Sequence, residues 1–402
     1  MSSRAIFEFL RLRQPPLHIL QSGIIVATAL WAVSTIVNSS FGLTAHRAVA
    51  TALHSVATFA NWEKQLGRES RKAYAGFMAQ LLWTQKQDVG PSARSDVAMV
   101  FDAARSRVVL FGGAGGATLF NDTWEWDGEN WTQYEDIGPT ARSRHAMAYD
   151  SKRGRIVLFG GSAGSLNLND TWEWDGDNWT QVADTGPPAR GGHAMAYDSL
   201  RGRVILFGGD DGQNSFGDTW AWDGANWTQE ADTGPPARTG HGMDYDNMRD
   251  RVVLVDGAGK STVQVQVQVW VQDSSGGWFS SPSGHYETHP QQQVKVKFLN
   301  DTWEYDGSVW TRVADTGPEP RMGCGLVYDG KTMLLFGGKD DTTFFKNTWE
   351  WEGKHWTQRQ DIGPAARAFA ALAYDSTRQR AVLFGGAGPG LFGDTWEQFF
   401  QA

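Results

Sequence analysis

Apolar and polar positions repeat along most of the chain with a short period that predicts β-strands. One unit, residues 142–181, contains four such segments: "RHAMAYD", "RIVLF", "DTWEW" and "NWTQ". The run "RIVLF" is too short for a helix and ends at Gly160–Gly161, which is typical of a strand buried on both faces. The alternation in "DTWEW" places Trp172 and Trp174 on one face of a strand, with the residues between them on the other.

The unit recurs six times. The phenylalanine that ends the second segment falls at Phe111, Phe159, Phe207, Phe336 and Phe384, and Val255 takes its place in one degenerate copy. Successive units are 48 residues apart, except for a step of 81 between Val255 and Phe336. The fourth unit therefore carries an insertion.

Four short antiparallel strands in each unit of roughly 45–50 residues indicate the blade of a β-propeller. The double glycine after the second strand, the tyrosine of "AYD" and the tryptophans of the third and fourth strands resemble the kelch repeat. More narrowly, they resemble bacterial kelch proteins related in fold to the galactose oxidase central domain. The resemblance covers residues 81–399 and implies an all-β fold, a six-bladed kelch-type propeller. It does not choose among scaffolds, sugar-active enzymes and ligand receptors.

The ends of the repeat region predict how the ring closes. The last unit ends on "GDTWEQFF" without a "WTQ" strand, whereas "LLWTQ" at 81–85 has no strand before it in its own unit. An unpaired sheet edge leaves backbone donors and acceptors unmet. We therefore expect Trp83–Gln85 to complete the blade that contains Trp396.

The first eighty residues have a different pattern. A basic leader precedes residues 17–37, "LHILQSGIIVATALWAVSTIV", which carry no formal charge. This pattern favours a signal-anchor or signal peptide within residues 1–43, with the rest of the chain outside the cytoplasm, membrane-anchored or secreted. The alternative is a helix packed on the protein. Residues 44–80, rich in Ala and without Pro, predict a helical stalk or cap.

Composition narrows the chemistry. The net charge of −9 argues against a nucleic-acid partner, because such proteins concentrate positive charge. The single cysteine, Cys324, excludes an intramolecular disulfide and a multi-cysteine zinc site.

Each unit enters its first strand through "GP-x-x-R". These arginines are Arg94, Arg142, Arg190, Arg238, Arg321 and Arg367. In a kelch propeller they surround the mouth of the central channel, so one interpretation is a cationic ring that binds a carboxylate or an acidic sugar. The other interpretation is that each arginine braces the neighbouring blade through loop carbonyls. Identity in all six units favours bracing, because a site for an asymmetric ligand needs blades that differ.

Three successive units place a histidine at one position: His145, His193 and His241. Three imidazoles can bind a metal, but the same position holds Val97, Cys324 and Ala370 in the other units, so it is interpreted as a packing site. No metal and no cofactor are expected.

The insertion, residues 260–298, breaks the symmetry of the repeat. "TVQVQVQVWVQ" and "QQQVKVKF" alternate and predict a β-hairpin that rises from the channel-mouth face of the fourth blade. It is either an arm for partner contact or self-association, or a spacer folded over the next blade. The candidate contact residues are Trp270, Trp278, Phe279 and Tyr286.

Other loops on that face differ between units, and variable loops on a rigid scaffold often carry recognition. Their candidate ligand-binding residues are Asp210, Asp211, Asp340 and Asp341.

We therefore expect a non-catalytic propeller that binds a protein or carbohydrate through the channel-mouth loops and the hairpin. No catalytic residues are assigned. The alternatives are a sugar-active enzyme of the mutarotase or epimerase kind, or of the galactose oxidase kind, and a scaffold without a small ligand.

Overall fold

The computed structural model describes residues 83–86, 89–134, 137–231, 233–272, 284–359 and 363–399. These residues form strands, turns and connections and contain no α-helix. The chain divides into two compact units, residues 1–79 and 80–402, and all described residues belong to the second. The apolar segment 17–37 and the region 44–80 lie outside them. Among the described residues, no helix is long and apolar enough to cross a membrane.

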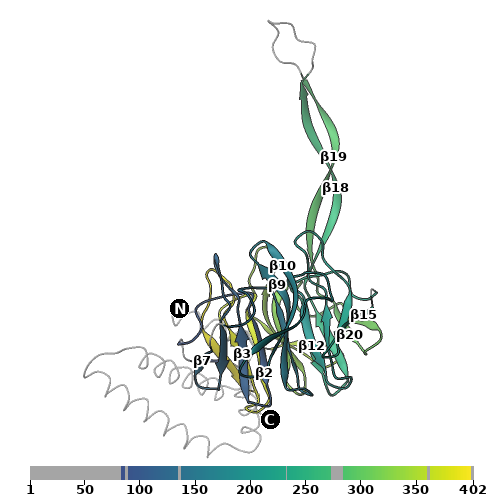
Figure 1. Ribbon diagram of the computed structural model, residues 1–402. Helices are drawn as coiled ribbons and strands as arrows, with labels where there is room; N and C mark the ends of the chain where they lie inside the picture. Colours follow the sequence, from purple (N-terminus) through teal and green to yellow (C-terminus); the bar gives the residue numbers. More distant parts are fainter. Residues whose placement is uncertain are drawn as a thin grey trace, which may run out of the picture. The chain divides into compact units, whose positions relative to one another are not determined.

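Six four-stranded antiparallel sheets are arranged as blades around a central axis (Figure 1). Blade 1 contains β2 (Ala98–Asp102), β3 (Arg107–Phe111), β6 (Thr123–Trp126) and β7 (Trp131–Gln133). Blade 2 contains β8 (Ala146–Asp150), β9 (Arg155–Ala163), β10 (Leu166–Trp174) and β11 (Trp179–Ala183). Blade 3 contains β12 (Ala194–Asp198), β13 (Arg203–Phe207), β14 (Thr219–Trp222) and β15 (Trp227–Ala231).

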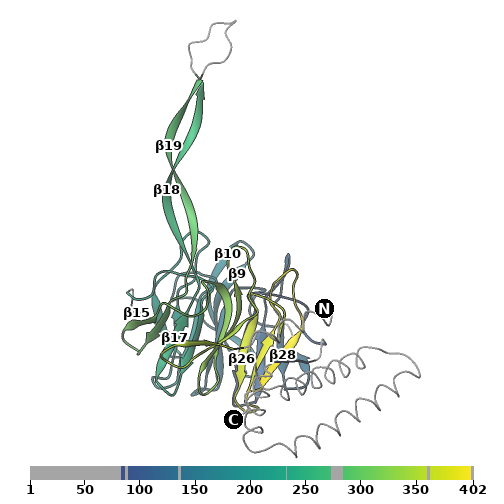
Figure 2. The ribbon, with the colours of Figure 1, turned by 180° about the vertical axis from the view of Figure 1, so that it is seen from behind.

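The other three blades follow the same plan (Figure 2). Blade 4 contains β16 (Gly242–Asp246), β17 (Arg251–Val255), β20 (Thr302–Tyr305) and β21 (Trp310–Ala314). Blade 5 contains β22 (Met322–Tyr328), β23 (Met333–Lys339), β24 (Thr348–Trp351) and β25 (Trp356–Gln358). Blade 6 contains β26 (Ala371–Asp375), β27 (Arg380–Phe384), β28 (Thr395–Phe399) and β1 (Trp83–Gln85).

Two hairpins lie outside the blades. β4 (Ala114–Gly115) and β5 (Thr118–Leu119) pair in the loop between β3 and β6. β18 (Ala258–Gln272) and β19 (Gly284–Phe298) pair between β17 and β20 and form the arm, residues 258–298, that projects from one face of the propeller.

The core lies between adjacent blades, which explains the continuous apolar runs. Each second strand is covered on both faces by its neighbours, so Val108 and Phe111 of β3 have no exposed surface. At the interface of blades 3 and 4, Phe207 packs with Met243 and Leu254.

Tryptophans join each blade to the one before it. The first residue of every outer strand donates its indole N–H to a threonine hydroxyl of the preceding blade. The pairs are Trp131–Thr395 (2.8 Å), Trp179–Thr123 (2.9 Å), Trp227–Thr171 (2.9 Å), Trp310–Thr219 (2.9 Å), Trp356–Thr302 (2.8 Å) and Trp83–Thr348 (3.4 Å). These six contacts link the blades all the way around the ring.

A closed cycle of six backbone hydrogen bonds surrounds the axis. In each blade, one residue at or just before the start of the inner strand has a positive φ. Its N–H donates to the carbonyl of the equivalent residue in the preceding blade. The members are Asp96, Phe369, Gly323, Gly240, Gly192 and Arg144, with N···O distances between 2.7 and 3.0 Å. The cycle lies at the end of the channel from which the arm projects, because the Thr239 N–H next to Gly240 bonds the carbonyl of Ala258 at the base of the arm.

The outer strand of blade 6 comes from the beginning of the repeat region. β1 pairs antiparallel with β28, with Trp83 opposite Gln398 and Gln85 opposite Trp396. The Trp83 ring lies 5.2 Å from that of Phe336 in blade 5. That the ring depends on this strand for its closure stays a prediction.

Candidate functional site

The six repeated arginines are enclosed, with exposed fractions of 1% or less. Arg238 is representative: its Nε donates to the Pro236 carbonyl (3.0 Å) and its Nη1 to the Asp256 carbonyl (2.8 Å). Its two Nη atoms also form a bidentate pair with Asp301, at 2.7 and 3.0 Å. The equivalent pairs are Arg94–Asp122, Arg142–Asp170, Arg190–Asp218 and Arg367–Asp394, whereas Arg321 contacts Asn347 and Glu319.

This geometry contradicts a cationic ring for an anionic ligand. The donors of Arg94, Arg142, Arg190, Arg238 and Arg367 are used by carboxylates and carbonyls of their own blades, so they are not offered to the channel mouth. Bracing is the role that the contacts support, with one correction. The main partner is the aspartate that precedes the Thr-Trp pair of the third strand in the same blade, not a loop carbonyl of the neighbouring blade.

The ion pairs change the titration of these aspartates. Burial opposes ionisation of Asp301, but the hydrogen bonds and charge of Arg238 outweigh it, so the pKa of Asp301 is lower than usual. The pKa values of Asp170, Asp218 and Asp394 are lowered for the same reasons. These carboxylates are therefore ionised at neutral pH and hold the arginines in place.

The four loop aspartates do not form one acidic patch. Asp210 is 2% exposed and pairs with Arg144 (2.5 Å), with Lys260 at 3.7 Å. Asp211 and Asp340 instead accept backbone N–H groups of their own turns. The buried position of Asp210 and its pair with Arg144 argue against it as a ligand contact, whereas Asp341 is exposed.

The three histidines lie between blades. His145, His193 and His241 are each 6% exposed and meet Phe111, Phe159 and Phe207 of the preceding blade edge-on. No group of three or more metal-ligating side chains occurs in the described part of the chain. In these three blades the histidine ring packs against a phenylalanine of the preceding blade.

Acid should destabilise the propeller through these histidines. Burial lowers the pKa of His145 and His241 to about 3, with help from the adjacent arginine charge, and lowers that of His193 well below its usual value. The unfolded chain takes up these protons near pH 6.5 and the folded chain only well below it, so stability falls as pH drops from about 6.5 toward 3.

Urea unfolding between pH 6.5 and 4.5 tests this expectation. His193→Val, which copies the residue of blade 1 at this position, should flatten the decline of the midpoint with falling pH. Exposed His355→Val should leave the decline unchanged. An unaltered slope in His193→Val would contradict the assignment.

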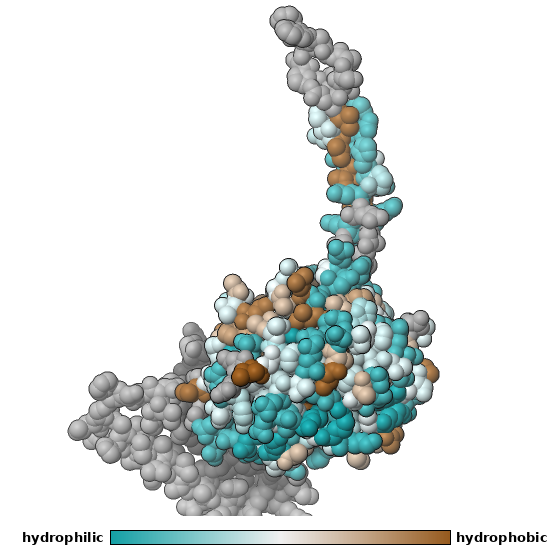
Figure 3. Space-filling view, in the orientation of Figure 1, coloured by the Kyte–Doolittle hydropathy of each residue, from teal (hydrophilic) through white to brown (hydrophobic). Residues whose placement is uncertain are grey.

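The arm is the largest departure from the repeat. Its strands pair over their whole length, from Ala258 opposite Phe298 to Gln272 opposite Gly284. At about 3.3 Å per residue, fifteen residues span roughly 50 Å. Figure 3 shows apolar residues gathered along part of the arm beside hydrophilic ones.

The two faces of the arm differ in character. On one face, Trp270 and Tyr286 are cross-strand partners that are 52% and 64% exposed, and their ring centroids are 4.9 Å apart. On the other face, valines alternate along β18, and Val269 is 45% exposed. Two of the candidate contact residues, Trp278 and Phe279, lie outside the described residues.

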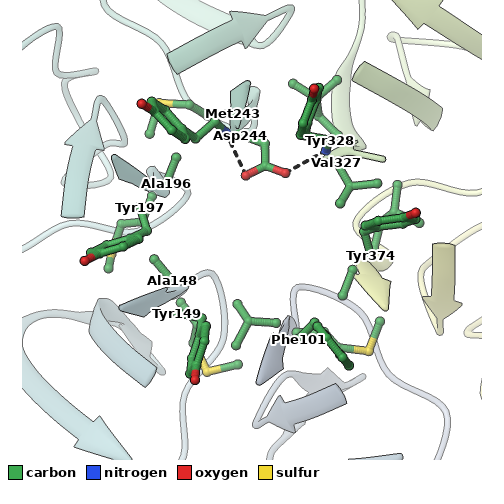
Figure 4. Close-up of a pocket in the computed structure, with 18 of the residues that line it drawn as sticks. Phe101, Ala148, Tyr149, Ala196, Tyr197, Met243, Asp244, Val327, Tyr328 and Tyr374 are labelled. Carbon is green, nitrogen blue, oxygen red and sulfur yellow. Dashed lines mark hydrogen bonds between the residues drawn. The ribbon is translucent and has the colours of Figure 1, made fainter. Parts of the chain in front are cut away.

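A cavity of about 300 Å³ lies on the axis between the inner strands (Figure 4). Each inner strand has a Phe or Tyr near its end, and the residue before that aromatic lines the cavity. These residues are Val100, Ala148, Ala196, Asp244, Val327 and Ala373. Asp244 points into the channel. Its carboxylate accepts the N–H of Tyr245 (2.8 Å) and, from blade 5, that of Tyr328 (2.7 Å).

Asp244 is a candidate site residue that the sequence reasoning missed. The signal was present, because aligning the six inner strands shows an aspartate where the other five units have Val or Ala. The direction of its side chain, however, becomes clear only in the assembled ring.

A family model described as the KLHDC2/KLHL20/DRC7 Kelch-repeats domain matches residues 177–386, just over half of the chain. No curated protein matches the chain.

Proposed function

This chain belongs to the kelch-repeat family, and from that premise we propose that it is a non-catalytic module that binds a protein partner through the β18–β19 arm. The observation that carries the proposal is an exposed, two-stranded ribbon on one blade of an otherwise regular propeller. The repeated arginines and histidines have structural roles, so recognition is assigned to what differs between blades.

The physical properties of a two-stranded ribbon support the proposal that the arm binds a partner. An isolated hairpin is marginally stable in water, and both of its edges leave backbone donors and acceptors without a neighbouring strand. A partner strand added to an edge would satisfy these groups, and a partner that covers the valine face would bury apolar surface. Trp270 and Tyr286 supply aromatic surface of the kind that dominates interface energies.

Replacing residues 262–294 by Asn-Gly should abolish partner capture. This change joins Ser261 to Lys295, which are cross-strand partners, through a two-residue turn and keeps the base of the arm. The full chain and the shortened chain, tagged at the C-terminus, are compared by quantitative affinity purification. The Kd of a purified captured protein is then measured against both.

Matched substitutions separate the two faces of the arm. The double variant Val267→Thr with Val269→Thr tests whether the valine face contributes to partner affinity. The double variant Gln266→Thr with Gln268→Thr is the control on the opposite face. If the shortened chain binds with unchanged affinity, the arm is not the recognition element. Sedimentation velocity distinguishes a second copy of this chain as the partner, and a glycan panel tests a carbohydrate.

We also propose that the apolar segment 17–37 exports or tethers the propeller outside the cytoplasm. Its basic leader and uncharged length support this. Cell fractionation of a C-terminally tagged chain should give membrane-associated or secreted protein that external protease reaches. Protease-resistant protein in the cytosolic fraction would refute the proposal.

A further inference from the structure

The channel contains a carboxylate without a balancing charge. No Lys, Arg or His occurs among the described residues that line the cavity. The Asp244 oxygens receive two backbone N–H groups, one from its own strand and one from β22. Burial is the main cause that raises the pKa of Asp244 to about 6, and the charge of Asp246 also raises it.

The surroundings make this charge unfavourable unless a ligand pairs with it. The five equivalent positions around the channel are Val or Ala, so the wall at this level offers methyl groups. Asp244 is half-buried at the channel wall. A charge that loses hydration in apolar surroundings is costly, and an opposite charge with hydrogen bonds relieves that cost. Two carboxylate oxygens have about four lone-pair sites, of which the backbone uses two.

The cavity has a preferred entrance. The backbone cycle of Asp96, Arg144, Gly192, Gly240, Gly323 and Phe369 surrounds the axis on the arm face, and none of these residues lines the cavity. At the opposite end the lining reaches Ser199 and Asn247, in the turns after β12 and β16. The next residues, Leu200 and Met248, are 61% and 76% exposed, so this entrance has an apolar border next to the blade that holds Asp244.

We propose that this channel binds the primary ammonium group of a ligand with an apolar stem, and that Asp244 accepts the ammonium hydrogen bonds. The stem lies against the alanines and valines of the wall and leaves past Leu200 and Met248. A divalent cation fits less well, because Ca²⁺ and Mg²⁺ prefer six or more oxygen ligands and the described residues of the lining supply one carboxylate. The site is on the face opposite the arm and does not depend on the role of the arm.

The ammonium group has two sources, a free alkylamine or a lysine side chain of a polypeptide. The probes are n-butylamine and Nα-acetyl-lysine methylamide at pH 8, where both are cationic. The neutral probe n-butanol has the same stem. Methyl NMR of the full chain follows Ala148, Ala196 and Val327 during each titration.

Either amine should shift these methyl signals with a millimolar Kd, and n-butanol should bind at least about tenfold more weakly. Asp244→Asn should weaken amine binding by about the same factor. Asp341→Asn, an equal change of charge on the exposed arm-face loop, should have no effect. Binding of the lysine derivative alone identifies a polypeptide as the source.

Equal binding of n-butylamine and n-butanol to the unmodified chain would overturn the proposal, even if Asp244→Asn failed to fold. So would unchanged amine affinity in folded Asp244→Asn, or shifts absent from all three methyl-bearing residues.

Discussion

Arg238→Met is expected to lower the free energy of unfolding by about 3–5 kcal/mol, because it leaves Asp301 buried without its partner. The Arg238 side chain has no exposed surface and that of Asp301 is 9% exposed, so water cannot replace the lost hydrogen bonds. Urea unfolding followed by tryptophan fluorescence measures the change at pH 7.

Two further variants distinguish a buried ion pair from a general effect of substitution. Arg312 pairs with Asp315 at 3.8 Å with side chains 51% and 68% exposed, so Arg312→Met should cost less than about 1 kcal/mol. The double variant Arg238→Met with Asp301→Leu should recover much of the loss, since it removes the unpaired charge. A single variant as stable as the unmodified chain would contradict the bracing role.

Trp83→Ala is expected to lower the free energy of unfolding by about 3 kcal/mol, at the low end for buried tryptophans, because Trp83 is half-buried. The change removes the contact with Phe336 and the indole hydrogen bond to Thr348, both of which link the outer strand of blade 6 to blade 5. Thermal unfolding of the full chain measures the loss.

Trp270→Ala is the matched control, because Trp270 is exposed on the arm and should change stability by less than about 0.5 kcal/mol. If Trp83→Ala melts like the control, β1 does not hold the ring closed. Removing residues 81–86 then provides the stricter test, since it exposes the whole edge of β28.

The strands of the propeller could be predicted because the sequence pattern of each strand recurs in several units. The apolar second strand and the alternating third strand follow from burial on two faces, and the repeat removes the ambiguity of any single copy. The arginine partners were harder to predict. The aspartate of "DTW" recurs in five units and Asn347 replaces it in blade 5, but the first two strands of the blade and their connections separate it from its arginine.

The cycle around the axis could not be predicted from the sequence. Its six positions hold Asp96, Arg144, Gly192, Gly240, Gly323 and Phe369, which share no side-chain property. What they share is a positive φ and a backbone N–H and carbonyl, which nearly every residue type supplies. A sequence pattern reports side chains, so a structure made by the backbone alone leaves little trace in it.

Repetition also separates scaffold from candidate site. Residues that recur in every blade, such as the buried arginines, make contacts within or between blades. The two features assigned to binding are departures from the repeat: the arm of blade 4 and Asp244 in the inner strand of the same blade. A symmetric scaffold gains a specific surface where one blade differs from the others.

Hydrogen–deuterium exchange of the full chain with and without its captured partner tests the role of the arm most directly. We expect that bound partner slows amide exchange in β18 and β19, which form a two-stranded sheet, and leaves exchange in the inner strands unchanged. Slowed exchange confined to the turns on the opposite face, with the arm exchanging as in the free protein, would contradict it.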